Sequence, residues 1–132
     1  MKFINELHLR KIDSGTWALT QPFFVNHALR GIKVEQGFKT DLATVPSYMR
    51  WLLPADGDYK ESAVIHDWLL KRMYDGNASI TRSIAASTFR DSLIYQGIAP
   101  WKIITLYTGV RLLDFYKAAK KWWSIKRYWR FP

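Results

Sequence analysis

The feature that most constrains the fold of this chain is the order of its predicted strands and helices. Short runs with strand character, separated by turn signals such as Asp13-Ser14-Gly15, fill the first 40 residues at 7–12, 16–20, 23–26, 32–35 and 37–40. Three helical segments follow, from about 58 to 74, from 79 or 81 to just before 97, and from 100 to about 123. Strands followed by helices predict an α+β fold, with one small antiparallel sheet packed against the three helices.

Composition limits the classes of protein that this chain can represent. Its 132 residues are 48% hydrophobic and only 23% charged, which excludes a disordered chain and suits a single domain. The absence of cysteine excludes disulfide scaffolds, zinc–thiolate sites and cysteine nucleophiles. We predict one domain over residues 1–123 and a basic, aromatic tail over residues 124–132.

Targeting signals are not evident in the sequence. The N-terminus lacks a basic region followed by an apolar run, so no signal peptide is predicted. The most apolar stretch, residues 101–116, is interrupted by Lys102, Arg111 and Asp114 and is shorter than a spanning helix requires. The expectation is a soluble protein made in a cytosol.

The positive charge of the chain is concentrated at its C-terminal end. The net charge is +9, but residues 1–98 hold 12 basic and 10 acidic side chains, whereas residues 99–132 hold 8 and 1. Cations mixed with aromatic rings suit a nucleic acid, a protein partner or a membrane surface. The predicted contact residues are Lys117, Lys120, Lys121, Lys126, Arg127, Trp129 and Arg130.

A purely structural interpretation of the last helix competes with a binding role. At helical spacing, Leu112, Tyr116, Ala119 and Trp123 share one face, which is predicted to pack on the domain while the lysines face water. Beyond 123 this pattern fails, because Lys126, Arg127 and Arg130 would enter the apolar face. The helix is therefore predicted to end near 123, where the tail begins.

Two polar segments are candidates for chemistry. The run Gly37-Phe38-Lys39-Thr40-Asp41-Leu42-Ala43-Thr44-Val45-Pro46 places a carboxylate and hydroxyls just after a strand, where loops build sites. The second segment is Ala63-Val64-Ile65-His66-Asp67-Trp68-Leu69, in the first predicted helix. His66 lies on its apolar face, and Asp67 points about 100° away.

Together, these two segments resemble the motifs of the phage and prophage family called domain of unknown function 1353, GF-x-TD-x-ASVP followed by a helix with A-x-x-HD-x-L. The similarity extends more weakly from about residue 23 to about 113. Thr44 replaces the usual Ser, and Ala86 stands where many members have Asp. The resemblance implies a viral or prophage origin, hence the infected host cytoplasm or the virion, and supplies no activity.

The residues leave two functions open. In the first, Asp41 and His66 form a structural polar pair, with Thr40 and Thr44 completing the hydrogen bonds, in a non-catalytic virion component or binding module. In the second, Asp41, His66 and Asp67 bind a divalent metal, oriented by Thr40 and Thr44, in a phage hydrolase acting on peptidoglycan or a phosphodiester. The first ranks slightly higher, because the chain has no cysteine and only three histidines. Its predicted partner is another phage or host protein, ahead of nucleic acid and a membrane surface.

Overall fold

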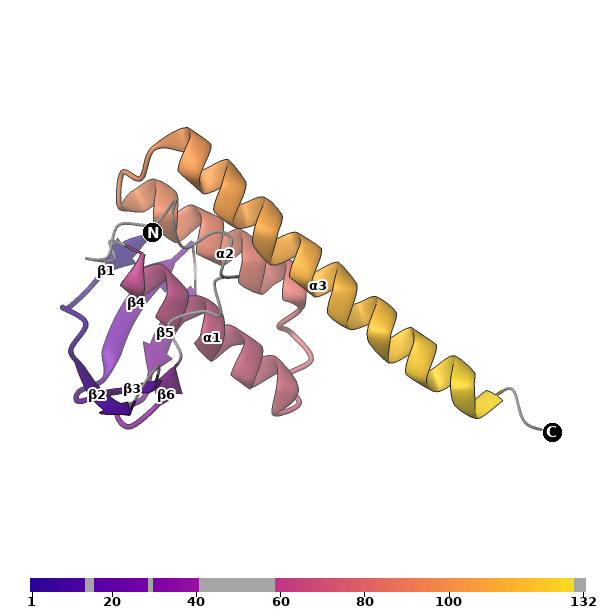
Figure 1. Cartoon of the computed structure of the whole chain (residues 1–132). Coiled ribbons are helices and arrows are strands. Elements are labelled where there is room, and N and C mark those ends of the chain that lie inside the picture. The colour runs from indigo at the N-terminus through magenta and orange to yellow at the C-terminus, as the bar shows by residue number, and fades with distance from the viewer. Residues whose placement is uncertain (14–15, 29, 41–58, 130–132) are drawn as a thin grey trace.

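The computed structural model describes residues 1–13, 16–28, 30–40 and 59–129, without the side chains of residues 118 and 121–129. Six short strands precede three helices, which confirms the α+β prediction (Figure 1). The strands are β1 (Lys2–Phe3), β2 (Leu9–Asp13), β3 (Thr16–Leu19), β4 (Phe23–His27), β5 (Arg30–Val34) and β6 (Lys39–Thr40). The helices are α1 (Lys60–Tyr74), α2 (Arg82–Tyr95) and α3 (Pro100–Trp129).

The strands form two antiparallel sheets of three strands, rather than the single sheet predicted. One has the order β1-β4-β5 and the other the order β2-β3-β6. The chain leaves β3 and enters β4 through residues 20–22, where Pro22 has no N–H to donate to a ladder. Strands β3 and β4, which this segment joins, pair in different sheets. Strand β1 escaped prediction because two residues are too few to show alternation.

The main core lies between the first sheet and α1. Alternate residues of β4 and β5 point inward, and Phe23, Val25 and Val34 are almost completely buried. They join a cluster with Val64 and Ile65 of α1. Complete burial of each large apolar side chain contributes about 2 kcal/mol, so this layer fixes α1 against the sheet.

Helix α2 connects this core to α3. It begins where predicted, since the side chain of Thr81 accepts a hydrogen bond of 3.1 Å from the backbone N–H of Ile84. It ends before Gly97, whose φ of 75° suits a residue without Cβ. Phe89 and Leu93 of α2 form a second apolar cluster with residues 103 and 106 of α3. Helix α2 therefore has one partner helix on each side.

Helix α3 differs from the prediction in its length and in its packed face. It continues to Trp129, so the predicted end near Trp123 is wrong, and its C-terminal part extends beyond the rest of the molecule (Figure 1). The residues that pack are Ile103, Leu106 and Val110. Because a helix is stiff, this packing turns Leu112 and Tyr116 outward, where they are 60% and 62% exposed. The prediction that those two pack on the domain is wrong.

No helix within the described residues is long and apolar enough to cross a membrane. The division into a domain of 1–123 and a tail of 124–132 remains a prediction. The helical backbone of residues 124–129 means that most of the predicted tail continues α3 without a break.

Candidate functional site

An open pocket of about 680 Å³ lies between β6 and α1. Phe38, Leu70 and Tyr74 provide much of its apolar wall, and Thr40 and Asp67 are polar groups in its lining. The pocket thus joins the two polar segments, which are 27 positions apart in the sequence at Thr40 and Asp67.

A hydrogen bond connects the two segments directly. The hydroxyl of Thr40 donates to the carboxylate Oδ2 of Asp67 across 2.5 Å. Thr40 is 3% exposed because it faces inward at the end of β6, where it pairs with Trp17 of β3. A short hydrogen bond to a carboxylate is among the stronger polar contacts in proteins. It ties the second sheet to α1 and orients the carboxylate at the pocket.

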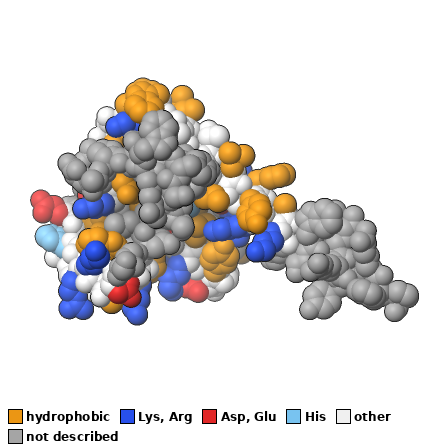
Figure 2. Space-filling view, in the orientation of Figure 1, with side chains coloured by type: hydrophobic (Ala, Val, Ile, Leu, Met, Phe, Trp, Pro, Cys, Tyr) orange, Lys and Arg blue, Asp and Glu red, His pale blue; other side chains and the backbone are white. Residues whose placement is uncertain are grey.

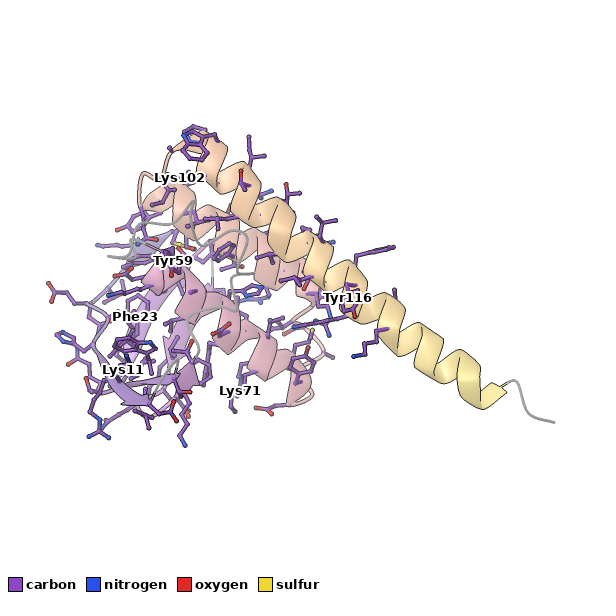
Figure 3. The ribbon with its side chains drawn as sticks, in the orientation of Figure 1. Lys11, Phe23, Tyr59, Lys71, Lys102 and Tyr116 are labelled. Atoms are coloured by element: carbon purple, nitrogen blue, oxygen red, sulfur yellow. The ribbon has the colours of Figure 1, made fainter. Side chains whose placement is uncertain are left out.

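Cations also line this pocket. Lys39 and Lys71 are exposed there, and the ammonium group of Lys71 lies 2.8 Å from the carboxylate of Asp75. The labelled Lys71 lies on the C-terminal half of α1 in Figure 3. A carboxylate, a hydroxyl and a lysine beside an apolar wall can bind a polar ligand with an apolar part.

His66 occupies a different environment from its neighbour Asp67. It is 7% exposed and its ring centroid lies 5.5 Å from that of Phe89 on α2. Neither ring nitrogen has a hydrogen-bond partner within the described part of the chain. Burial, together with the positive charges of Lys117 and Arg82, lowers the pKa of His66 from 6.5 to about 4. The imidazole is therefore neutral at pH 7.

Of the predicted cluster of Asp41, His66 and Asp67, the structure describes His66 and Asp67. Asp41 and Thr44 lie outside the described residues. Among the residues that the structure describes, no group of three His, Asp or Glu side chains could hold a metal. The donor set of the predicted metal site is thus incomplete within the described ranges, and the metal site remains a prediction.

Charged residues that the sequence interpretation missed lie near His66, between α2 and α3. Asp114 is 7% exposed, and its carboxylate lies 3.9 Å from Arg82 Nη1 and 3.6 Å from Arg111 Nη1. Burial raises the pKa of Asp114, and the nearby Arg111, Arg82 and Lys117 oppose that rise. Asp114 is the one acidic residue of the basic C-terminal segment. That isolation was a signal that it has a specific partner.

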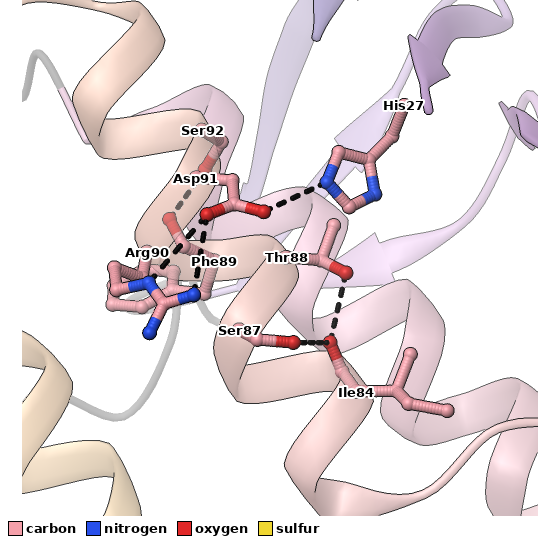
Figure 4. Close-up of polar contacts among 8 residues, drawn as sticks. All are labelled: His27, Ile84, Ser87, Thr88, Phe89, Arg90, Asp91 and Ser92. Carbon is pink, nitrogen blue, oxygen red and sulfur yellow. Dashed lines mark hydrogen bonds and ion pairs between the residues drawn. The ribbon is translucent and has the colours of Figure 1, made fainter. Parts of the chain in front are cut away.

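A second missed pair connects β4 to α2. His27 Nε2 lies 2.8 Å from the carboxylate of Asp91 (Figure 4). Ser87 and Thr88 line an adjacent pocket of about 500 Å³ together with His27, and both hydroxyls donate to the carbonyl of Ile84. The partners are 64 positions apart, so no local pattern announces them. The hydroxyls of Ser87 and Thr88 are bonded to the backbone, so the pair of His27 and Asp91 is interpreted as a structural connection between β4 and α2.

The predicted contact residues of the C-terminal segment lie along α3. Lys117 and Lys120 occupy exposed positions. The backbone of residues 121, 126, 127 and 129 is helical, and their side chains lie outside the description. The other predicted contact, Arg130, lies outside the described residues entirely.

Comparison with known proteins identifies one family. Neither the curated proteins nor the solved structures provide a match. The family described as protein of unknown function (DUF1353) matches residues 17–110, which is more than half of the chain and includes Thr40, His66 and Asp67. This match confirms the resemblance drawn from the two polar segments, and the chain belongs to the DUF1353 family.

Proposed function

We propose that this protein is a non-catalytic binding module of a phage, either a virion component or a factor acting in the infected cell, and that α3 carries its contact surface. The observation that supports this most is the exposed apolar side of α3. Phe115 is 74% exposed and Leu112 is 60% exposed, although ample apolar surface is buried elsewhere in the protein. Exposed apolar residues grouped on one element are typical of an interaction site.

The surroundings of His66 and Asp67 also favour a binding module over an enzyme. Asp67 contacts Thr40 at the open pocket, whereas His66 is enclosed against Phe89. Because neighbouring helical residues diverge by about 100°, their environments differ as expected. A neutral, buried imidazole suits the interior of a domain.

Site-specific photocrosslinking tests the proposal. A photoreactive amino acid at position 115 is expected to crosslink a distinct partner in phage-producing cells, whether that partner is protein, nucleic acid or lipid. The same label at Ile12, an exposed position on β2, serves as the control. Equal crosslinking from both positions, or none from position 115, would contradict a contact surface on α3.

A metal-dependent phage hydrolase of peptidoglycan or phosphodiesters is the second candidate. It is favoured by the pocket that brings Thr40 and Asp67 together, because both belong to the segments typical of the family. On this proposal, calorimetry should detect one Mn²⁺, Mg²⁺ or Zn²⁺ per chain, and Asp67→Asn should weaken its binding. A folded protein that binds none of these ions would reject the hydrolase.

A further inference from the structure

Helix α3 presents a continuous face that points away from the body. We define this outer face by residues that share exposure and helical spacing: Trp101, Ile104, Thr108, Leu112, Phe115 and Tyr116. At about 100° per residue they fall within an arc of about 120°. Hydrophobic side chains, drawn in orange, lie along α3 in Figure 2. Figure 3 labels Tyr116 on this helix. The packed residues 103, 106 and 110 lie on the opposite side.

Positive charge borders this face on both sides. By the same spacing, Lys102 and Lys120 lie at one edge of the outer face and Arg111 lies at the other. Asp114 is the one acidic residue among residues 99–132, and it is buried on the opposite side of the helix. An apolar strip between cationic edges therefore faces solvent with no acidic side chain beside it on α3.

We infer that the outer face of α3 binds the surface of an anionic lipid bilayer, with the helix axis in the plane of the membrane. This inference rests on the proposed function, because it names the partner of the same surface. Helices that lie in a membrane interface bury Trp, Phe and Leu among the lipid chains and place Lys and Arg beside the headgroups. The packed residues 103, 106 and 110 join α3 to the body on the side opposite the outer face, and the body lies to one side of α3 in Figure 1.

The chemistry of the face favours lipid over two other partners. Over residues 101–120 this arc holds no cation, and its polar groups are the hydroxyls of Thr105, Thr108 and Tyr116, whereas a helix that follows nucleic-acid phosphates needs cations along its contact line. A second copy of the chain would place the cationic edges of two α3 helices side by side, in a protein whose net charge is +9. An anionic bilayer satisfies both the apolar strip and its charged edges.

Vesicle sedimentation with the full-length protein tests this inference. The wild type should bind vesicles of equal parts phosphatidylcholine and phosphatidylglycerol, and bind pure phosphatidylcholine weakly. The double substitution Leu112→Ser with Phe115→Ser should reduce the partition coefficient about tenfold or more. The matched control, Ile12→Ser with Ile94→Ser, alters exposed isoleucines on β2 and α2 and should leave it unchanged.

A second pair of variants tests the charged edges. Lys102→Ala with Lys120→Ala should reduce binding to the anionic vesicles by about fivefold per cation. Lys11→Ala with Lys33→Ala, which removes two exposed cations from β2 and β5, is the control with the same change in net charge. Equal losses in both pairs would show unspecific charge attraction and overturn the inference.

Absence of vesicle binding would also overturn the lipid inference. Two further measurements would then identify the partner of the outer face. Dimerisation in sedimentation velocity that is lost in the Leu112→Ser and Phe115→Ser variant would assign the face to a second copy. Salt-sensitive binding to duplex DNA that is lost in the same variant would assign it to nucleic acid. In either case, crosslinking from position 115 would still support a binding module. If crosslinking fails as well, the proposed function fails with the lipid inference.

Discussion

Adjacent polar residues on α1 have opposite surroundings. His66 lies in the interior against α2, and Asp67 lies at an open pocket with its carboxylate bonded to Thr40. The angle of about 100° between successive helical residues is sufficient to separate them. His66 and Asp67 form one short sequence motif, but the first side chain lies in the interior and the second lies at the pocket.

The largest expected effect tests the interior side of this comparison. His66→Ala should lower the free energy of unfolding by about 3 kcal/mol, because it leaves a cavity beside Phe89. His66→Leu fills the same space without polar atoms and should remain within about 1 kcal/mol of the wild type. Chemical denaturation measures both. A large loss in His66→Leu would show that the imidazole makes a specific polar contact.

The pH dependence of stability isolates the protonation of the same residue. The folded-state pKa of His66 is about 4, below the ordinary 6.5, so the unfolded chain binds the proton more tightly. Stability should therefore decrease as the pH falls from about 6.5 to about 4, by at most about 1.4 kcal/mol per pH unit from this residue.

His66→Leu provides the control for this pH effect. Subtracting its stability from that of the wild type at each pH removes the contributions of other groups, including Asp114, whose raised pKa acts in the opposite direction. The difference should be flat above pH 7 and should become steadily less favourable to the wild type as the pH falls from 6.5 to 4. A difference that is flat throughout would place His66 in a solvated environment.

The pocket side of the comparison should give a smaller effect. Thr40→Val removes the hydroxyl that donates to Asp67 and should cost about 2 kcal/mol. Thr108→Val makes the same chemical change at an exposed position of α3 and should stay within about 0.5 kcal/mol. Thermal unfolding of the two variants compares them directly. Equal effects would mean that the bond to Asp67 adds nothing to stability.

The smallest expected effect extends the comparison to α3. Phe115→Ser on the outer face should change stability by less than about 0.5 kcal/mol, because that side chain is 74% exposed. Leu106→Ser, on the packed face at 5% exposure, is the contrasting variant and should be strongly destabilising. A marked loss of stability in Phe115→Ser would show that the outer face packs within the protein.

Local patterns were sufficient for much of the fold. Strand-like runs between turn signals predicted strands at 23–26 and 32–35, which overlap β4 and β5, and helical periodicity ending at Gly97 predicted both ends of α2 to within a few residues. The division of six strands between two sheets was not predictable, because it depends on pairings between distant segments such as Trp17 with Thr40.

The candidate site shows the same limit. The sequence selected Thr40, His66 and Asp67, and the structure brings Thr40 and Asp67 together at 2.5 Å. The sequence alone could not reveal the pair of His27 with Asp91, or the position of Asp114 between Arg82 and Arg111. These partners meet only when helices and strands pack. The further candidates Asp41 and Thr44 lie outside the described residues.

The sequence by itself determined the α+β class, the family and the concentration of positive charge in residues 99–132, since each depends on residue order alone. Only the tertiary structure decided which face of α3 packs. Apolar residues occur all around this helix, and periodicity cannot choose between them. Contact of Ile103 and Leu106 with α2 made that choice, and the stiffness of the helix then left Leu112 and Phe115 in solvent.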